Sequence, residues 1–224
     1  MHSRELENCI LFQNIPVHEI KTLLSTVPYR VQEFHKGETV FRLMEPALRI
    51  GIVLSGKVEV QKTFERGSQI NVSVRGPGEL VGPAAAFSSQ RRYPCDIVAL
   101  EPTSILILHR QDLLQLLQKD IRILENFTSQ IASATYMLQQ RLELFSYSGI
   151  AQKAAFYLLV QMRQNGRQTV RIPETISRWA LLMNVSRPSL HRELRHLSDQ
   201  GILACKPPAV TILKPEALED ILSH

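Results

Sequence analysis

Residues 175–197, TISRWALLMNVSRPSLHRELRHL, decide the fold of the C-terminal part of this chain. Thr175 suits the N-cap of a first short helix, and Asn184 tolerates the left-handed backbone that a tight turn between helices needs. Ser186 then suits the N-cap of a second helix, with Pro188 in its first turn, where a missing N–H costs nothing. The stretch therefore predicts a helix-turn-helix.

The second predicted helix has an inward leucine face, and its arginines lie elsewhere on the helix. Such a helix enters the major groove of DNA, where Arg187 and Arg192 can each form a bidentate pair with guanine. We predict that short hydroxyl side chains and the remaining cations anchor phosphates. The predicted DNA-binding residues are Thr175, Ser177, Ser186, Arg187, Ser189, His191, Arg192, Arg195 and Lys206. The alternative is a plain helical hairpin with solvated arginines.

Regular structure is also predicted on both sides of this motif. Residues 150–162 carry alanines and leucines at helical spacing and predict a preceding helix. Two short β-type runs, 201–204 and 209–212, predict a two-stranded wing joined across residues 206–208, and residues 215–222 predict a closing helix. The C-terminal part is therefore expected to be a winged helix-turn-helix.

The chain from Tyr29 to His109 has the texture of an all-β domain. Short β-type runs alternate with glycine-containing turns, and residues 65–68 predict a hairpin tip. This spacing predicts a barrel or jelly roll. The expected strands are 29–35, 49–55, 57–64, 69–75, 94–99 and 103–109.

A heptad pattern follows the β-rich part. Residues at heptad positions a and d form a narrow seam over more than three heptads, with Gln and Arg around it. The seam residues are Ile121, Leu124, Thr128, Ile131, Thr135, Leu138, Leu142 and Phe145. We predict one long helix that pairs with the same helix of a second copy. The alternative is an amphipathic helix packed on its own barrel.

Composition sets wide limits on function. Lys and Arg total 26 against 21 for Asp and Glu, so the net charge of +5 permits nucleic-acid binding without requiring it. Cys9, Cys95 and Cys205 are too far apart for a zinc site and too few for a disulfide framework. No segment has the pattern of a signal peptide or a membrane span, so we expect a cytoplasmic protein.

The main competing class is a metal-dependent enzyme built on a cupin-like β-roll. A cupin centre needs clustered histidines, and the β-rich part contains only His35 and His109. We therefore predict no enzyme activity and no metal site.

Four segments carry a family resemblance, and the last is the most specific. They are Gly56-Lys57-Val58, Gly78-Glu79-Leu80-Val81-Gly82, the heptad helix running into Ile150-Ala151-Gln152, and the run from Asn184 to Leu194. Over nearly its full length the chain resembles the Crp/Fnr family of bacterial regulators. The resemblance implies that the protein binds palindromic duplex DNA as a homodimer under a small-molecule effector, with RNA polymerase as a further partner.

The resemblance also implies the domain plan. We expect an α+β protein with a jelly-roll or β-roll sensor domain at residues 1–112, a dimerisation helix at 113–146 and a winged helix-turn-helix at 147–224. The family commonly reads bases with Arg, Glu and Arg on the recognition helix. Arg187 and Arg192 match the arginines, whereas Pro188 replaces the Glu, so readout of cytosine by a carboxylate should be absent.

The same resemblance implies an unusual effector. In members that bind cyclic AMP, a Glu soon after the Gly-Glu-Leu turn holds the ribose, and an Arg followed by Ser, Thr or Ala holds the cyclic phosphate. Pro83 and Tyr93-Pro94 occupy these positions here, so we predict no tight binding of cyclic AMP. Iron–sulfur members need several N-terminal cysteines, and haem members need an axial ligand. With Cys9 alone at the N-terminus and only isolated histidines, no cofactor is predicted.

An unidentified small-molecule effector is expected between the roll and the long helix. The aromatic and arginine side chains there would suit a small organic anion or an aromatic acid. The predicted effector residues are Phe87, Arg91, Arg92, Tyr93, Thr135 and Gln139. In the alternative, Phe87 and Tyr93 belong to the core and the arginines are solvated. A third function class also stays open, a nucleotide-binding module whose C-terminal domain contacts proteins.

Overall fold

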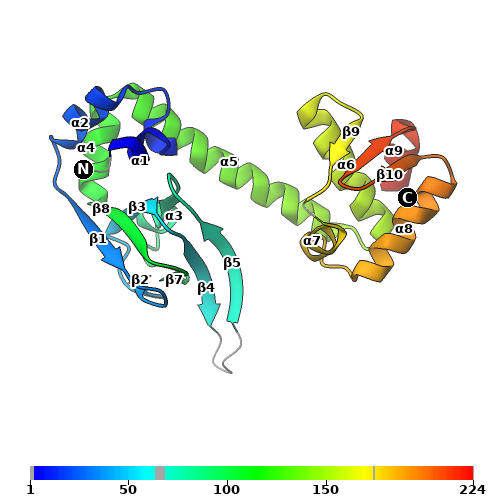
Figure 1. Cartoon of the computed structure of the whole chain (residues 1–224), viewed down its shortest axis with the longest axis horizontal. Coiled ribbons are helices and arrows are strands. Elements are labelled where there is room, and N and C mark those ends of the chain that lie inside the picture. The colour runs from blue at the N-terminus through cyan, green and yellow to red at the C-terminus, as the bar shows by residue number, and fades with distance from the viewer. Residues whose placement is uncertain (1–2, 64–68, 174, 224) are drawn as a thin grey trace. The chain divides into compact units, whose positions relative to one another are not determined.

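A computed structural model describes residues 3–63, 69–173 and 175–223 (Figure 1). The chain divides into two compact units, Met1–Ala134 and Thr135–His224. Each unit has its own hydrophobic core, the first running from Leu6 to Phe127 and the second from Leu144 to Leu218.

The first unit is a β-roll of two antiparallel sheets. One sheet has the order β1-β8-β3-β6 and the other the order β2-β7-β4-β5. The strands are β1 (Tyr29–Phe34), β2 (Thr39–Phe41), β3 (Arg49–Ser55), β4 (Val58–Thr63), β5 (Gln69–Arg75), β6 (Leu80–Val81), β7 (Asp96–Ala99) and β8 (Thr103–His109). All six expected strands are present, and β2 and β6 are additions. The expected hairpin tip at residues 65–68 lies outside the described residues.

Strands β3 and β8 form the centre of the first sheet because their sequences are almost wholly apolar. Residues 50–54 of β3 and 103–108 of β8 are buried, as expected for strands covered on both faces. The short helix α3 (Pro83–Phe87) follows β6, and Gly82 at its N-cap has φ +82°. A Cβ at Gly82 would lie 3.0 Å from Cε1 of Tyr93, so both the backbone and the packing require glycine there.

An N-terminal helical segment packs on the roll. It comprises α1 (Ser3–Glu7), the 3₁₀ turn η1 (Ile10–Phe12) and α2 (Val17–Leu24), and Leu11 and Phe12 are fully buried. Its backbone also bonds the roll, since the N–H of Ile10 donates to the carbonyl of Gly78 at 3.2 Å. Sequence patterns did not predict these helices.

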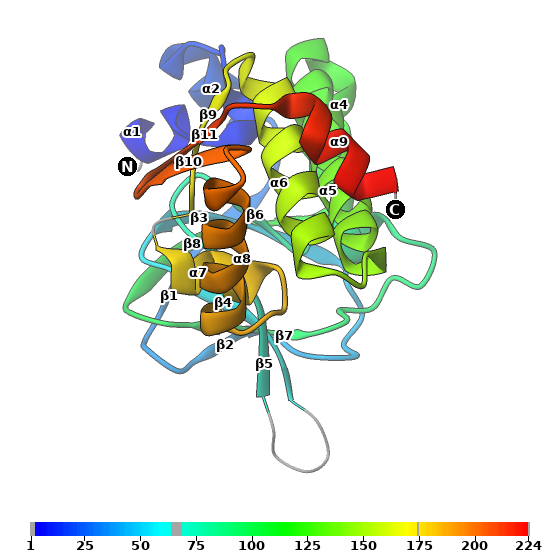
Figure 2. The same cartoon turned by 90° about the vertical axis from the view of Figure 1, so that its right-hand side faces the viewer.

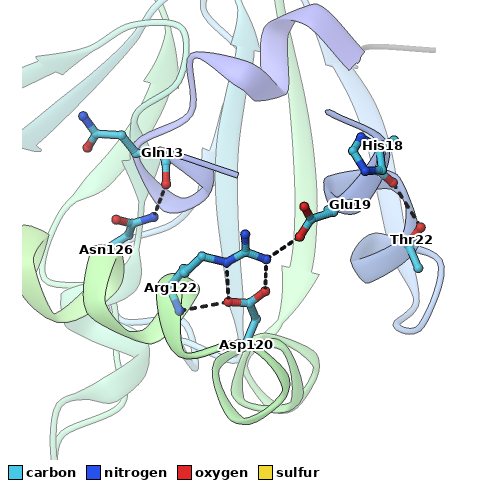
Figure 3. A network of polar contacts seen from close by, with 7 residues as sticks. All are labelled: Gln13, His18, Glu19, Thr22, Asp120, Arg122 and Asn126. Atoms are coloured by element: carbon cyan, nitrogen blue, oxygen red, sulfur yellow. Dashed lines mark hydrogen bonds and ion pairs between the residues drawn. The ribbon is translucent and has the colours of Figure 1, made fainter. Parts of the chain in front are cut away.

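Two helices follow the roll. Helix α4 (Arg110–Lys119) ends at Asp120, whose carboxylate accepts the backbone N–H of Arg122 and so caps α5 (Ile121–Ser146). The side chain of Arg122 binds Asp120 with two hydrogen bonds, of 3.0 and 2.7 Å, and also binds Glu19 of α2 (Figure 3). The amide of Asn126 donates to two carbonyls of the N-terminal segment. These bonds attach α2 and η1 to the beginning of α5.

The second unit contains several helices packed around one hydrophobic core, and a small sheet (Figure 2). Its elements are α6 (Ile150–Asn165), β9 (Thr169–Arg171), α7 (Ile176–Leu182), α8 (Arg187–Asp199), β10 (Leu203–Lys206), β11 (Ala209–Ile212) and α9 (Pro215–Ser223). The sheet has the order β10-β11-β9, so the predicted two-stranded wing gains a third strand. The predicted α+β class, with a β-roll, a long helix and a winged helix-turn-helix, is confirmed.

Candidate nucleic-acid interface

The helix-turn-helix is formed by α7, α8 and the turn between them. Thr175 caps α7, because its hydroxyl accepts the N–H of Arg178 at 3.1 Å. Asn184 has φ 53°, which is the left-handed conformation expected from the sequence, and the N–H of Val185 donates to the carbonyl of Ala180 at 3.0 Å. These local bonds fix the angle at which α8 leaves α7.

The N-terminus of α8 is held by two serines. The hydroxyl oxygen of Ser186 accepts the N–H of Ser189 at 3.2 Å and donates its own proton to the hydroxyl of Ser189 at 2.7 Å. Ser186 is therefore engaged in capping. The hydroxyl proton of Ser189, which is half-buried, stays available for an acceptor such as a phosphate oxygen.

The two faces of α8 differ sharply in polarity. Its buried residues are Leu190, Leu194 and Leu197. Its exposed residues include Arg187, His191, Arg192 and Arg195. A basic face on a helix with a capped N-terminus is the arrangement that proteins use to enter the major groove.

An open groove of about 470 Å³ lies beside the beginning of both helices. It brings together Thr175, Ser177 and Arg187 with the turn Pro207-Pro208 of the wing. The wing is held there by a hydrogen bond of 3.0 Å from the N–H of Ile172 to the carbonyl of Pro208. Lys206 is exposed at the end of β10 but does not line this groove.

A buried aromatic core supports the interface. Trp179 of α7 is fully buried, and its ring lies 5.2 Å from that of Tyr157 on α6. Ala180 of α7 is buried, and its carbonyl accepts the N–H of Val185 in the turn before α8. The ammonium of Lys153 donates to the carbonyl of Met183 at 3.4 Å, which ties α6 to the end of α7.

Sequence reasoning missed two exposed cations on this unit. Arg178 lies in the first turn of α7, and Arg171 lies on β9, next to the residue that bonds the wing turn. Arg171 was missed because β9 has only three residues. One buried residue, Val170, between two exposed ones is too short a pattern to predict a strand.

Two predicted effector residues of the first unit, Tyr93 and Phe87, make packing contacts. Tyr93 is only 1% exposed, its ring stacks on Phe41 at 4.7 Å, and its hydroxyl donates to the carbonyl of Arg49 at 2.7 Å. Burial raises the pKa of the Tyr93 phenol. Tyr93 is therefore a core residue in this structure. Phe87 is half-buried between the guanidinium of Arg110, 5.1 Å away, and the ring of Phe127, 5.2 Å away.

The remaining predicted effector residues are exposed. Arg92 donates from Nη1 to the carbonyl of Met44 at 2.7 Å, and Arg91 has φ 47°. Thr135 and Gln139 lie on the C-terminal half of α5, which belongs to the second unit.

The predicted seam of α5 is solvent-exposed in the single chain, with one exception. Ile123 and Phe127 pack into the first core from a different face of the helix. The exposed seam residues are Ile121, Leu124, Thr128, Thr135, Leu138, Leu142 and Phe145. Leu138 is 61% and Leu142 is 71% exposed. Ile131 alone is partly buried against the first core.

In the described ranges, no group of three or more His, Cys, Asp or Glu side chains could hold a metal ion. His35 follows the Phe34–Thr103 pair and His109 follows the Leu108–Tyr29 pair, so they lie at opposite ends of the β1–β8 ladder. Among the described residues, no helix is long and apolar enough to cross a membrane.

Two family models match different parts of the chain. The model described as "Cyclic nucleotide-binding domain" matches residues 31–120, and the model described as "Crp-like helix-turn-helix domain" matches residues 152–221. The first match covers most of the β-roll, and the second covers the helices and the wing described above.

Similar proteins align along most of the chain. The "Cyclic AMP receptor protein" of Thermus thermophilus is 26% identical over 211 residues, covering 94% of this chain and 95% of its own length. The "Global nitrogen regulator" of Synechococcus elongatus is 20% identical over 204 residues, covering 88% and 91%. The crystal structure of the Thermus thermophilus "Catabolite Activator Protein" aligns with a TM-score of 0.56 at 25% identity, covering 96% of this chain and 98% of that one.

Proposed function

The chain belongs to the Crp/Fnr family and is a Crp-like transcription regulator with a helix-turn-helix DNA-binding domain, and from this premise we propose its specific mode of action. It binds a palindromic duplex as a homodimer, and its affinity for DNA is set by a small molecule other than cyclic AMP. It acts in the cytoplasm and meets RNA polymerase at its promoters.

The observation that carries this proposal is the exposed basic face of α8. Arg187 and Arg192 are exposed on a helix whose inward face is a row of buried leucines. Each guanidinium can bind O6 and N7 of a guanine, while Thr175, Ser177 and Ser189 supply hydroxyls for phosphates. Lys206 adds a phosphate contact from the wing.

Dimerisation is supported by the exposed seam of α5. A row of leucines, isoleucine and phenylalanine this exposed is costly in water and is stabilised by an identical row from a second copy. Two copies related by a twofold axis present two α8 helices about one DNA turn apart, which requires a palindromic site.

The effector proposal is supported by the residues at the positions that hold cyclic AMP in relatives. Pro83, the first residue of α3, offers no carboxylate for a ribose, and Tyr93 packs into the core with its hydroxyl already bonded. The Thermus relative is named for cyclic AMP, and under this proposal the present chain takes a different ligand. Arg91 and Arg92, which directly precede Tyr93, are exposed and suit an organic anion, with Phe87 as a further candidate contact in the first unit.

Selection from a random duplex pool tests the DNA-binding proposal. We expect the purified dimer to enrich a palindrome with guanines in both half-sites, and its affinity to fall steeply with salt as phosphate counterions are released. A protein-contact domain would enrich no sequence. Enrichment of non-palindromic DNA by a monomer would contradict the homodimer.

Titration calorimetry tests the effector proposal. Cyclic AMP is expected to give no heat of binding at millimolar concentration, while a panel of small organic acids contains at least one that changes the affinity for the selected palindrome. Micromolar binding of cyclic AMP would overturn the proposal. If no acid of the panel changes the affinity for DNA, the proposal that the effector is an organic anion fails.

A further inference from the structure

Resting on the DNA-binding role proposed above, we infer that Pro188 recognises the 5-methyl group of a thymine in each half-site. The family resemblance implies a carboxylate at this position of the recognition helix, and this chain has an apolar ring there. The specificity of the protein at one base pair per half-site is thereby determined by van der Waals contact.

The position of Pro188 on α8 supports this inference. The buried residues Leu190, Leu194 and Leu197 mark the inward face of the helix. With 3.6 residues per turn, the residues that lie most nearly opposite them are spaced by four, three and four positions. They are Pro188, Arg192, Arg195 and Asp199, which we call the outward stripe. All four are exposed.

Pro188 lies at the N-terminal end of the outward stripe. It is the second residue of α8, and the N-terminal residues of a recognition helix reach the base edges. Arg192 follows one turn later on the same face, and Arg187 precedes it in the chain. Pro188 is thus the apolar residue between the two arginines proposed to bind guanines.

The chemistry of proline limits what it can recognise. Its ring has no donor or acceptor, so it cannot pair with the polar atoms of a base edge. The apolar group that bases present in the major groove is the thymine methyl. The missing backbone N–H costs nothing, because the N–H groups of a first helical turn have no partners within the helix. The Ser186 cap holds this turn in place without using Pro188.

Replacement of thymine by deoxyuridine, one position at a time, tests the inference on the unaltered protein. The probe is the palindrome selected under "Proposed function", and affinity is measured by fluorescence anisotropy. We expect one thymine per half-site whose loss of the methyl weakens binding about threefold to fivefold, the change that corresponds to removing one methyl from an apolar contact. If no thymine responds, the inference fails.

The variant Pro188→Ser separates direct contact from an effect of deoxyuridine on DNA shape. Serine is tolerated in a first helical turn and removes the ring. We expect the variant to bind thymine and deoxyuridine duplexes equally at the sensitive position. An equal response of the variant and the unaltered protein to deoxyuridine would overturn the inference. Pro188→Ala, which retains one methyl, is expected to give an intermediate response.

The variant Pro188→Glu supplies an independent readout. A carboxylate at this position accepts from cytosine N4, so a repeated selection should change the preferred base from thymine to cytosine at the sensitive position and nowhere else. An unchanged preference would contradict the placement of Pro188 at a base edge. Burial of Trp179, followed by its fluorescence, verifies that each variant is folded. If the unaltered protein enriches no palindrome, the proposed function itself fails.

Discussion

Arg192 lies one helical turn after Pro188 on the outward stripe of α8, and its side chain is exposed. We expect Arg192→Ala to weaken binding to the selected palindrome by about 1–3 kcal/mol and to relax the preference at one base pair per half-site. Arg163→Ala is the matched control, because it removes the same charge from an arginine paired with Glu219 at 2.9 Å. Equal weakening on all sequences would mean that Arg192 contacts phosphate.

The stability of the first unit should depend on pH through the carboxyl group of Asp120. Its hydrogen bonds and charge pairing with Arg122 hold the pKa of this carboxyl below its usual range. A lowered pKa contributes stability that is fully present above the ordinary aspartate value, about 3.9, and is lost as the pH falls through the lowered value.

The variant Asp120→Asn isolates this charge, because asparagine is also a good N-cap. We expect it to melt at a lower temperature than the unaltered protein near neutral pH, and this difference to shrink as the pH falls below about 4. Circular dichroism melts at several pH values measure it, with Asp199→Asn, at the end of α8, as the control. A difference that is independent of pH would contradict the role of the Asp120 charge.

Local chemistry at the helix-turn-helix could be predicted from sequence, and the contacts of Tyr93 could not. The Thr175 and Ser186 caps and the left-handed Asn184 depend on neighbours within four residues, so their residue types suffice. The location of Tyr93 depends on Phe41 and Arg49, more than forty residues away in the chain. The sequence shows an aromatic residue there and does not show which partner it packs against.

At the scale of elements, the exposed seam makes α5 the part of the chain whose disruption should change oligomeric state. Leu138→Glu places a charge on the seam, and burying that charge in a dimer costs ~3 kcal/mol or more. We expect the dimer constant to weaken at least about 100-fold, measured by sedimentation equilibrium. Ser133→Glu, an exposed position outside the seam, should leave the dimer intact. A dimer that survives Leu138→Glu would favour a different interface.

Long helices and strands could be predicted because a periodic pattern of apolar residues is recognisable only over several residues. The ranges of β3, β5 and β8 agree with the expected strands, and the heptads predicted α5. Strands β2, β6 and β9 were missed, since two or three residues show no alternation. The break at Asp120 was missed as well, because a carboxylate inside a helix-rich stretch is ordinary until its bonds to Arg122 are seen.

At the scale of the whole molecule, two separate cores predict two separable unfolding transitions. Trp179 is the chain's single tryptophan and lies in the second core, so its emission reports that unit alone. Excess palindromic duplex should raise the free energy of unfolding of the second unit by about 2.7 kcal/mol at 100 times the dissociation constant, and the Trp179 midpoint should rise with it. Circular dichroism reports both units.

The comparison of these two signals gives a clear outcome. If the duplex stabilises the second unit, the midpoint followed by Trp179 emission should rise. The part of the dichroism change that comes from the first unit should keep its midpoint. A Trp179 midpoint that ignores the duplex would contradict DNA binding by this unit.

The N-terminal segment determines where the first unit can be excised. The family match begins at residue 31, yet Leu11 and Phe12 are buried in the core of the first unit, and the amide of Asn126 donates to the carbonyls of Leu11 and Gln13. A fragment that started at residue 31 would leave voids the size of these side chains and bare apolar strands beneath them. We expect such a fragment to aggregate during purification. Its failure to bind a ligand would then reflect a damaged fold and not the absence of a binding site.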